Sequence, residues 1–195
     1  MIETQSLFAP TDGGPHGLQY HAGFVSPNEE QQLIAHIRKL PLQPFQFGAY
    51  EGKRQVISFG WRYDHGDRRL KKAQDIPDWL RPFMARIEAL ANPFAKDRPG
   101  GICSVLCTQY DEGAGIGWHR DKPHFGEVFG LSLASACKFR FRRQAATSWE
   151  RFTLVAEPRS LYVMEGEARN VWEHSIPAVD ALRYSITFRT MREPN

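Results

Sequence analysis

The chain has 195 residues, of which 42% are hydrophobic and 24% are charged, so it is long enough to enclose a core of its own. Its net charge of +3 is too small to indicate nucleic-acid binding by itself, and it has no run of about eighteen apolar residues that could cross a bilayer. Its polar start also lacks an export signal. We therefore expect one domain over residues 1–195, in the cytoplasm, monomeric and without membrane contact.

Two helices are predicted in the first half of the chain. Residues 1–19 are rich in Gly and Pro and are expected either to form a mobile arm or to fold over a sheet. After them, Ser26 can cap a helix, Pro27 suits its first turn and Glu29 completes a capping box. This helix should end before Pro41, with an apolar stripe at helical spacing formed by Leu33, Ile34, Ile37 and Leu40. The second helix should run from about Pro77 to Leu90, with inward-facing Trp79, Leu80, Phe83, Ile87 and Leu90.

Short β-like runs separated by turns make up the chain from Ile102 onward. So many strands in under a hundred residues predict a sandwich or jelly-roll. The expected fold class is therefore α+β but mainly β, with the earlier helices covering the sheet. The predicted strands are Cys103–Tyr110, Val128–Leu133, Lys138–Arg142, Arg151–Val155, Ser160–Met164 and Leu182–Arg189.

The cysteine pattern favours reduced thiols. Cys103, Cys107 and Cys137 are an odd number, and none belongs to a Cys-x-x-Cys pair. A disulfide framework or a zinc site is therefore not expected. We predict instead that these thiols are buried as small hydrophobic groups.

His119 and Asp121 form the most informative motif in the chain. Residues two apart on an extended segment point to the same side, so both side chains can reach one ion while Arg120 turns away. His174, more than fifty residues downstream, could complete the set from a distant strand. Two neutral imidazoles and one carboxylate can cap one face of a ferrous ion and leave three positions for a cosubstrate and dioxygen. The sequence therefore predicts an oxygen-activating iron enzyme.

The segment Arg183–Arg189 alternates between polar and apolar residues. One face carries Arg183, Ser185, Thr187 and Arg189, and the other carries Tyr184, Ile186 and Phe188, which can pack into a core. Two arginines on one face need an anion, and guanidinium groups bind carboxylates in a bidentate manner. A dicarboxylate in the mouth of a barrel would satisfy this row, and the phenol of Tyr110 could donate to the same anion.

Together, these segments resemble the AlkB-like family of iron(II)- and 2-oxoglutarate-dependent dioxygenases. The resemblance covers most of the chain from about Tyr20 and runs through Arg54–Gly60, Thr108–Tyr110, Gly113, Ile116, His119–Asp121, Leu131–Leu133, His174 and Arg183–Arg189. It implies a double-stranded β-helix, the jelly-roll core of this family, with dioxygen, 2-oxoglutarate and Fe(II) at a catalytic site whose metal ligands are His119, Asp121 and His174.

The resemblance also implies which residues hold 2-oxoglutarate. Tyr110 and Arg183 would bind its distal carboxylate, and Arg189 would lie near its metal-chelating end. Ser185 and Thr108 would complete the contacts, although Thr108 stands where the family usually has asparagine and its hydroxyl reaches less far. Members that repair nucleobases usually carry an acidic residue two positions after the metal aspartate. This chain has Lys122-Pro123-His124 instead, which weakens the repair reading and leaves the iron chemistry untouched.

Residues 54–72 would form a substrate lid by the same resemblance, with a polar loop from Asp64 to Lys72. Within them, Trp61 and Tyr63 could form a stacking platform for an extruded base, worth about 1–3 kcal/mol per stacked base, or they could be ordinary core residues. His124, close to the metal motif, could contact the substrate or lie on the surface. Two basic clusters could bind phosphate or be solvated faces; one is Arg62, Arg68, Arg69, Lys71 and Lys72, and the other is Lys138, Arg140, Arg142 and Arg143.

Three functions follow as hypotheses. The first, implied by the resemblance, is oxidative demethylation of alkylated nucleobases in DNA or RNA, of the alkylation-repair type, with the methylated nucleic acid as partner. The second is hydroxylation of a modified tRNA base or of a protein side chain, which the missing acidic residue after Asp121 favours. The third is a non-catalytic RNA-binding module, which the intact metal and arginine sets argue against.

Overall fold

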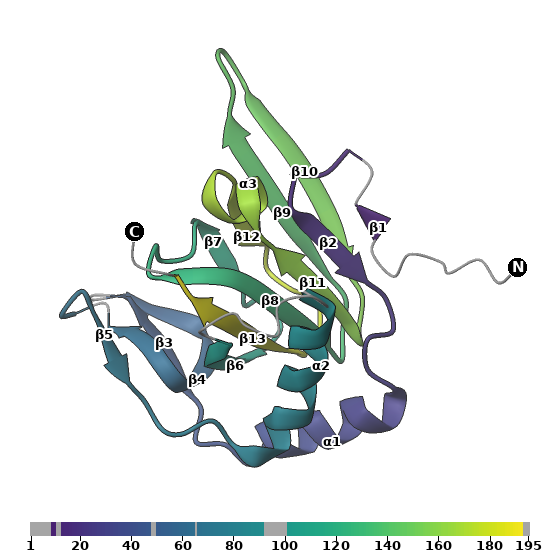
Figure 1. Cartoon of the computed structure of the whole chain (residues 1–195), viewed down its shortest axis with the longest axis vertical. Coiled ribbons are helices and arrows are strands. Elements are labelled where there is room, and N and C mark those ends of the chain that lie inside the picture. Colours follow the sequence, from purple (N-terminus) through teal and green to yellow (C-terminus); the bar gives the residue numbers. More distant parts are fainter. Residues whose placement is uncertain (1–8, 11–12, 48–49, 65, 92–100, 193–195) are drawn as a thin grey trace, which may run out of the picture.

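Two antiparallel β-sheets form the body of the protein (Figure 1). The computed structural model describes residues 9–10, 13–47, 50–64, 66–91 and 101–192. Within them, the larger sheet has the order β1-β2-β11-β8-β13-β6-β4-β3, with β5 paired to β4. Its strands are β1 (Ala9–Pro10), β2 (Leu18–His21), β3 (Gln43–Phe47), β4 (Tyr50–Asp64), β5 (Arg69–Lys72), β6 (Ile102–Tyr110), β8 (Phe125–Leu133), β11 (Ser160–Met164) and β13 (Arg183–Met191).

The smaller sheet has the order β10-β9-β12-β7. Its strands are β7 (Ile116–His119), β9 (Cys137–Gln144), β10 (Trp149–Ala156) and β12 (Glu173–Ile176). A core cluster with residues from both sheets, including Tyr110 on β6 and Phe139 and Phe141 on β9, lies between them. This double-stranded β-helix confirms the predicted fold class, and all six predicted strands are present with small shifts at their ends.

Two helices cover the larger sheet, as predicted. Helix α1 (Pro27–Ile37) begins with the expected capping box: the Ser26 hydroxyl accepts from the Glu29 amide at 3.2 Å, and the Glu29 carboxylate accepts from the Ser26 amide at 2.7 Å. Helix α2 (Arg81–Ala91) follows the short 3-10 helix η1 (Asp78–Leu80), so the predicted second helix starts as a tighter turn. Apolar side chains of α1, η1 and α2 join the core against the sheet, including the fully buried Leu33, Ile37, Leu80 and Ile87.

The alternation of β13 divides the molecule into two layers. Tyr184, Ile186 and Phe188 pack in the cluster beneath the helices, as predicted. Residues of its other face, including Thr187 and Arg189, line a cavity between the sheets. Alternate residues of β13 therefore belong to the structural core and to the lining of the cavity.

The segment after Tyr63 corrects a prediction. We expected a polar loop from Asp64 to Lys72, but β4 continues through Asp64 and β5 pairs with it to form a hairpin. The Asp64 carboxylate closes the turn by accepting from the amides of Gly66 and Asp67, each at 3.0 Å. This bond pattern is an Asx turn, which lets a polar sequence form a tight reversal between strands.

The start of the described chain lies on the sheet. Strand β2 pairs with β11, and β1 pairs with β2, so this part of residues 1–19 folds over the sheet edge. Gly17 is required there, because a Cβ at this position would lie 2.3 Å from the Glu165 carbonyl oxygen. Residues 1–8 and 11–12, also part of the predicted arm, lie outside the described residues.

The three cysteines are free thiols. Cys107 and Cys137 are buried, as predicted, whereas Cys103 is only half-buried. Burial raises the pKa of Cys107 to about 12, so this thiol is protonated and unreactive at neutral pH. In the described part of the chain, no helix is long and apolar enough to cross a membrane.

Candidate metal centre

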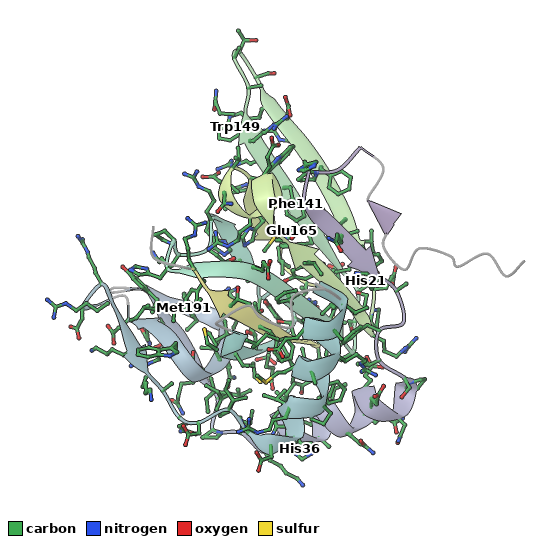
Figure 2. All side chains as sticks on the ribbon, viewed as in Figure 1. His21, His36, Phe141, Trp149, Glu165 and Met191 are labelled. Carbon is green, nitrogen blue, oxygen red and sulfur yellow. The ribbon has the colours of Figure 1, made fainter. Side chains whose placement is uncertain are left out.

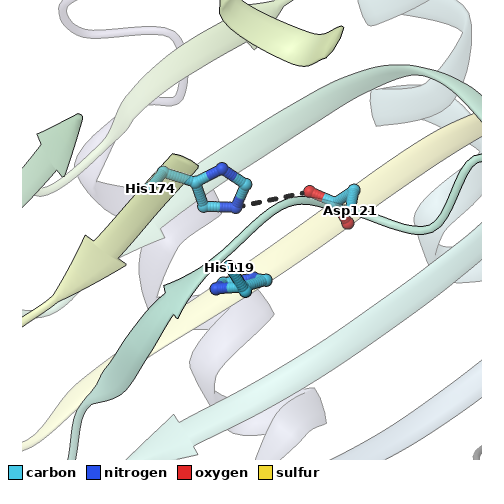
Figure 3. A group of neighbouring side chains, drawn as sticks. All are labelled: His119, Asp121 and His174. Atoms are coloured by element: carbon cyan, nitrogen blue, oxygen red, sulfur yellow. Dashed lines mark ion pairs between the residues drawn. The ribbon is translucent and has the colours of Figure 1, made fainter. Parts of the chain in front are cut away.

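Two strands and one loop bring the predicted metal ligands together (Figure 3). His119 ends β7, and its partner across the antiparallel pair with β12 is His174, so both rings lie on the same side of the smaller sheet. The ring centroids are 4.3 Å apart, and His174 Nε2 is 3.4 Å from Asp121 Oδ2. One potential ligand atom from each residue lies within 4.8 Å of the others. The predicted convergence is confirmed.

The position of Asp121 has a different cause from the one we predicted. We expected the strand period to align it with His119, but β7 ends at His119 and Asp121 lies in the loop beyond. In the loop, the carboxylate is held by Arg189, whose Nε donates to Oδ1 at 2.9 Å. This contact, rather than the period of a strand, therefore directs the ligand.

The protonation states of His119 and Asp121 and the orientation of the His119 ring suit metal binding. His119 Nδ1 lies 2.9 Å from the Gly117 carbonyl oxygen, and donation to this oxygen leaves Nε2 free to coordinate. Burial, together with the neighbouring His174, lowers the pKa of His119 to about 4, so the ring is neutral at physiological pH. Burial alone would raise the pKa of Asp121, but Arg189 and the two histidines hold it well below its usual range. The site therefore combines the neutral His119 imidazole, the His174 imidazole and one carboxylate, the residue types of a non-haem iron(II) site.

Arg169 holds the loop that carries Asp121. This buried residue lies on α3 (Gly166–Asn170), and its guanidinium donates to four backbone carbonyls: those of Gly126 at 2.9 Å, Lys122 at 2.7 Å, Phe125 at 2.8 Å and Asp121 at 3.4 Å. The sequence analysis did not select Arg169. No local pattern could have indicated it, because its acceptors belong to a segment more than forty residues away.

Arg183 is also buried, but unlike Arg169 it has hydrogen-bond donors without acceptors. It is fully buried on β13 and donates from Nη2 to the Ser132 hydroxyl at 3.1 Å, but its Nε and Nη1 have no hydrogen-bond partner among the described residues. Its guanidinium carbon lies 4.8 Å from the centroid of the Tyr110 ring. Burial raises the pKa of the nearby Cys137 thiol and Tyr162 phenol, so neither offers a negative charge. A buried cation with two unused donors is costly unless an anion meets it.

Of the predicted cosubstrate contacts, Thr108, Tyr110 and Arg189 line the cavity that holds the candidate ligands, whereas Arg183 does not. Ser185 pairs with Thr108, and Arg183 with Tyr110, in the register of β13 and β6. Arg189 donates to Asp121 Oδ1 from Nε at 2.9 Å and from Nη2 at 2.8 Å, so its anion in this structure is the candidate metal ligand. Ser185 is not among the residues that line the cavity. Beside the three candidate ligands, those that do include Arg54, Thr108, Tyr110, Tyr162, Thr187 and Arg189.

The predicted substrate residues are only partly brought together. Tyr63 on β4 faces His124 in the metal loop, with ring centroids 5.5 Å apart, and Lys122 Nζ lies 4.8 Å from the Tyr63 centroid. None of Trp61, Tyr63 and His124 lines the cavity, and Lys72 of the same hairpin lies 5.9 Å from the Trp61 ring. Arg54 lines the cavity instead and stacks on Phe45 at 3.9 Å. The sequence analysis named Arg54 only as part of the family resemblance, because its chemistry gives no local signal.

Comparison with known proteins places this site in a family. Residues 17–189 match the family model of the 2OG-Fe(II) oxygenase superfamily. This range covers most of the chain and includes every site residue named above. The chain belongs to this superfamily. For a 2OG-Fe(II) oxygenase, the His119, Asp121 and His174 cluster is the candidate iron site, and the donor set described here fits that ion.

Within the superfamily, the chain is similar to proteins named as AlkB homologues. The chain is 28% identical to the "Alkylated DNA repair protein ALKBH8 homolog" of Arabidopsis thaliana over 90% of its own length and 56% of that protein. It is 25% identical to "RNA demethylase ALKBH9B" of the same plant, over 91% of its own length and 40% of that protein. The chain thus spans about half the length of these curated relatives. The structure of OsALKBH1 superposes with a TM-score of 0.67 at 16% identity, covering 93% of this chain and 99% of that one, which supports the shared fold.

Proposed function

We propose that this 2OG-Fe(II) oxygenase oxidatively demethylates methylated nucleobases in nucleic acid, with RNA as the preferred polymer. The observation that carries the proposal is the candidate iron triad in a cavity also lined by Tyr110, whose ring contacts the buried Arg183, a cation with two unused donors. Similarity to a protein named as an RNA demethylase supports the choice of substrate. The missing acidic residue after Asp121 argues for a substrate other than the bases handled by typical repair members.

Arg183 binds the distal carboxylate of 2-oxoglutarate in this proposal. Its unused N–H groups can donate to that carboxylate, and burial excludes competing water. Tyr110 supplies a phenol from the paired position on β6, and the Thr108 and Ser185 hydroxyls lie one register step further along. Arg189 sits at the other end of the row, where it fixes Asp121 and meets the metal-chelating end of the cosubstrate.

Bound iron supplies the activation of dioxygen, and the protein positions the reactants and excludes water. In the overall reaction, 2-oxoglutarate and dioxygen give succinate and carbon dioxide, and one oxygen atom enters a C–H bond of an N-linked methyl group. The resulting hemiaminal releases formaldehyde and leaves the demethylated base. Tyr63 and His124, which face each other beside the metal loop, are the residues we propose to contact that base, and Trp61 is proposed as an outer contact on the same hairpin.

A second candidate reaction is hydroxylation without loss of carbon, on a modified tRNA base or on a protein side chain. The Lys122-Pro123-His124 segment favours it, because Pro123, between a lysine and a histidine, stands where repair members have an acid. The two reactions share every step up to insertion of the oxygen atom. They differ only in whether the oxidised carbon is attached to nitrogen and can leave as formaldehyde.

One experiment separates these possibilities. The protein is loaded with Fe(II) and 2-oxoglutarate without oxygen, and mass spectra of methylated RNA, methylated DNA and bulk tRNA are recorded after oxygen is admitted. Demethylation predicts formaldehyde and loss of the methyl mass, whereas hydroxylation predicts the gain of one oxygen atom. His119→Ala and Arg183→Ala should each abolish turnover. Nucleic-acid binding without succinate formation would show that the chain is a binding module and that the proposal is wrong.

A further inference from the structure

The outer surface of the smaller sheet carries a second arrangement of cations and aromatic rings. Along β9, the side chains of Phe139 and Phe141 are buried between the sheets, so their neighbours in the strand point outward. The β9–β10 hairpin projects from the body of the molecule, and Trp149 lies at its far end (Figures 1 and 2). We call this surface the outer cationic face; its residues are Trp118, Lys138, Arg140, Arg142, Trp149, Arg151 and Glu173.

Positive charge on this face is largely unmatched. Arg142 is paired with Glu173 at 2.7 Å, but Lys138, Arg140 and Arg151 have no carboxylate within ion-pair distance among the described residues. Arg151 joins the face because it pairs with Arg142 in the register of β10 and β9. Four cations therefore share one exposed sheet surface with a single acid. Such a field attracts a polyanion.

Arg143, the next residue on β9, provides a comparison. It points to the opposite side, lies 4.9 Å from the Trp172 ring, and is paired with Glu150 at 2.6 Å and Glu167 at 3.0 Å. The hairpin cluster at Arg62 and Lys71 is likewise paired with aspartates. Arg68, Arg69 and Lys72 of that cluster have no ion pair among the described residues, so it also keeps a charge excess. The outer cationic face differs because its arginines are stacked on tryptophans.

Stacking fixes the guanidinium groups on this face. The centroid of the Trp118 ring lies 5.1 Å from the guanidinium carbon of Arg140 and 4.4 Å from that of Arg142. The guanidinium carbon of Arg142 also lies 4.4 Å from the centroid of the Trp149 ring. Arg140 and Arg142 each use Nε for their protein hydrogen bonds, to Ser175 and Glu173 respectively. Their terminal nitrogens remain for a ligand. Arginines held in this way lose little side-chain freedom when they meet a phosphate.

The position of the face relates it to the candidate iron site. Trp118 precedes His119 on β7, and Glu173 precedes His174 on β12, so the face is the reverse side of the strands that carry two of the candidate ligands. Strand β7 is the edge strand of the smaller sheet. A chain bound across the face can therefore pass around this edge toward the loop that carries Asp121.

We propose that the outer cationic face binds the sugar-phosphate backbone of single-stranded RNA that flanks the modified base. Arg140, Arg151 and Lys138 contact phosphates, and the exposed Trp149 stacks on a base, the combination found where proteins track single strands. The choice of RNA rests on the proposed function. The surface itself is inferred from its charge excess and its stacked arginines alone.

Binding of unmodified single-stranded RNA to the iron-free protein tests this inference separately from turnover. Fluorescence anisotropy of a labelled oligonucleotide is measured over a range of salt concentrations for the wild type and for the triple variant Lys138→Gln, Arg140→Gln, Arg151→Gln. The triple variant should bind at least about tenfold more weakly at low salt. Its slope of log affinity against log salt should fall by about 2, because each lost phosphate contact on a single strand contributes about 0.7.

Arg143→Gln is the matched control, since this arginine is also stacked on tryptophan but is already paired with carboxylates. It should bind RNA within about twofold of the wild type, and thermal melting should show that both variants are folded. Trp149→Ala should weaken RNA binding about tenfold and leave binding of heparin, a polyanion without bases, unchanged. An unchanged salt slope in the folded triple variant, or an equal loss in Arg143→Gln, would overturn the inference. A loss of binding in the triple variant supports it even if no demethylation is found.

Discussion

Two buried arginines, Arg169 and Arg183, carry the same charge in opposite circumstances. All three guanidinium nitrogens of Arg169 donate to carbonyls of the loop that bears Asp121. Arg183 makes a single hydrogen bond, to Ser132, and two of its nitrogens have no partner among the described residues. A buried cation whose donors are satisfied by the backbone belongs to the scaffold. One whose donors are not satisfied is prepared for a ligand.

Removal of Arg183 should give the largest effect on activity. We expect Arg183→Met to lower kcat/KM for 2-oxoglutarate at least about 100-fold, because the distal carboxylate loses a desolvated charge partner. The metal-free variant should melt no lower than the wild type, since the arginine has few partners to lose. Succinate production and thermal melting measure the two effects. If the KM for 2-oxoglutarate stays at the wild-type value, Arg183 is not the carboxylate anchor.

Arg169→Met should show the reverse pattern. Four backbone carbonyls would lose their donor, so the free energy of unfolding should fall by about 3 kcal/mol, measured by urea denaturation. Loosening of the loop should also weaken Fe(II) binding about 10–100-fold, which an anaerobic titration can follow. Arg192→Met, a change of arginine on the outside of the same region, provides the control. Unchanged stability and iron affinity in Arg169→Met would remove the contrast between the two arginines.

A smaller effect is expected at the phenol beside Arg183. Tyr110→Phe keeps the ring beneath the guanidinium and removes only the hydroxyl. Loss of one hydrogen bond to a charged group should raise the KM for 2-oxoglutarate about tenfold, with little change in kcat. Steady-state kinetics with varied 2-oxoglutarate tests this. A fall in kcat with constant KM would place the phenol in the chemical step instead of in cosubstrate binding.

Ser132→Ala should have the smallest effect. It removes the one hydroxyl that accepts from Arg183, at 3.1 Å, and leaves the row of ligand-facing donors in place. We expect a loss of about 1 kcal/mol in stability of the metal-free protein and a change in KM for 2-oxoglutarate of less than about threefold. Saturating 2-oxoglutarate should reduce the stability difference, because the ligand supplies acceptors to the same guanidinium. A larger loss than in Arg169→Met would show that Arg183 is the more structural of the two.

Features set by local rules were predictable from the sequence. The capping box at Ser26 forms because its partners are three residues apart, and the alternation in Arg183–Arg189 separates core from cavity because strands have a period of two. The spacing of His119, Asp121 and His174 predicted the iron site, and together with the Arg183–Arg189 row and the other matching segments it indicated the family. The hairpin at Asp64–Lys72 was missed, because its turn depends on side-chain acceptors for backbone amides that composition alone presents as a loop.

What the sequence determined by itself was therefore the identity of the chemistry: a strand-rich chain with two histidines, an aspartate and a row of arginines. The tertiary structure decided which buried polar groups have hydrogen-bond partners. The pairing of β7 with β12 sets His119 opposite His174, Arg169 holds the loop that delivers Asp121, and Arg183 is left with unused donors. Hydrogen-bond partners distant in the chain depend on packing between elements, and no local pattern of residues encodes that packing.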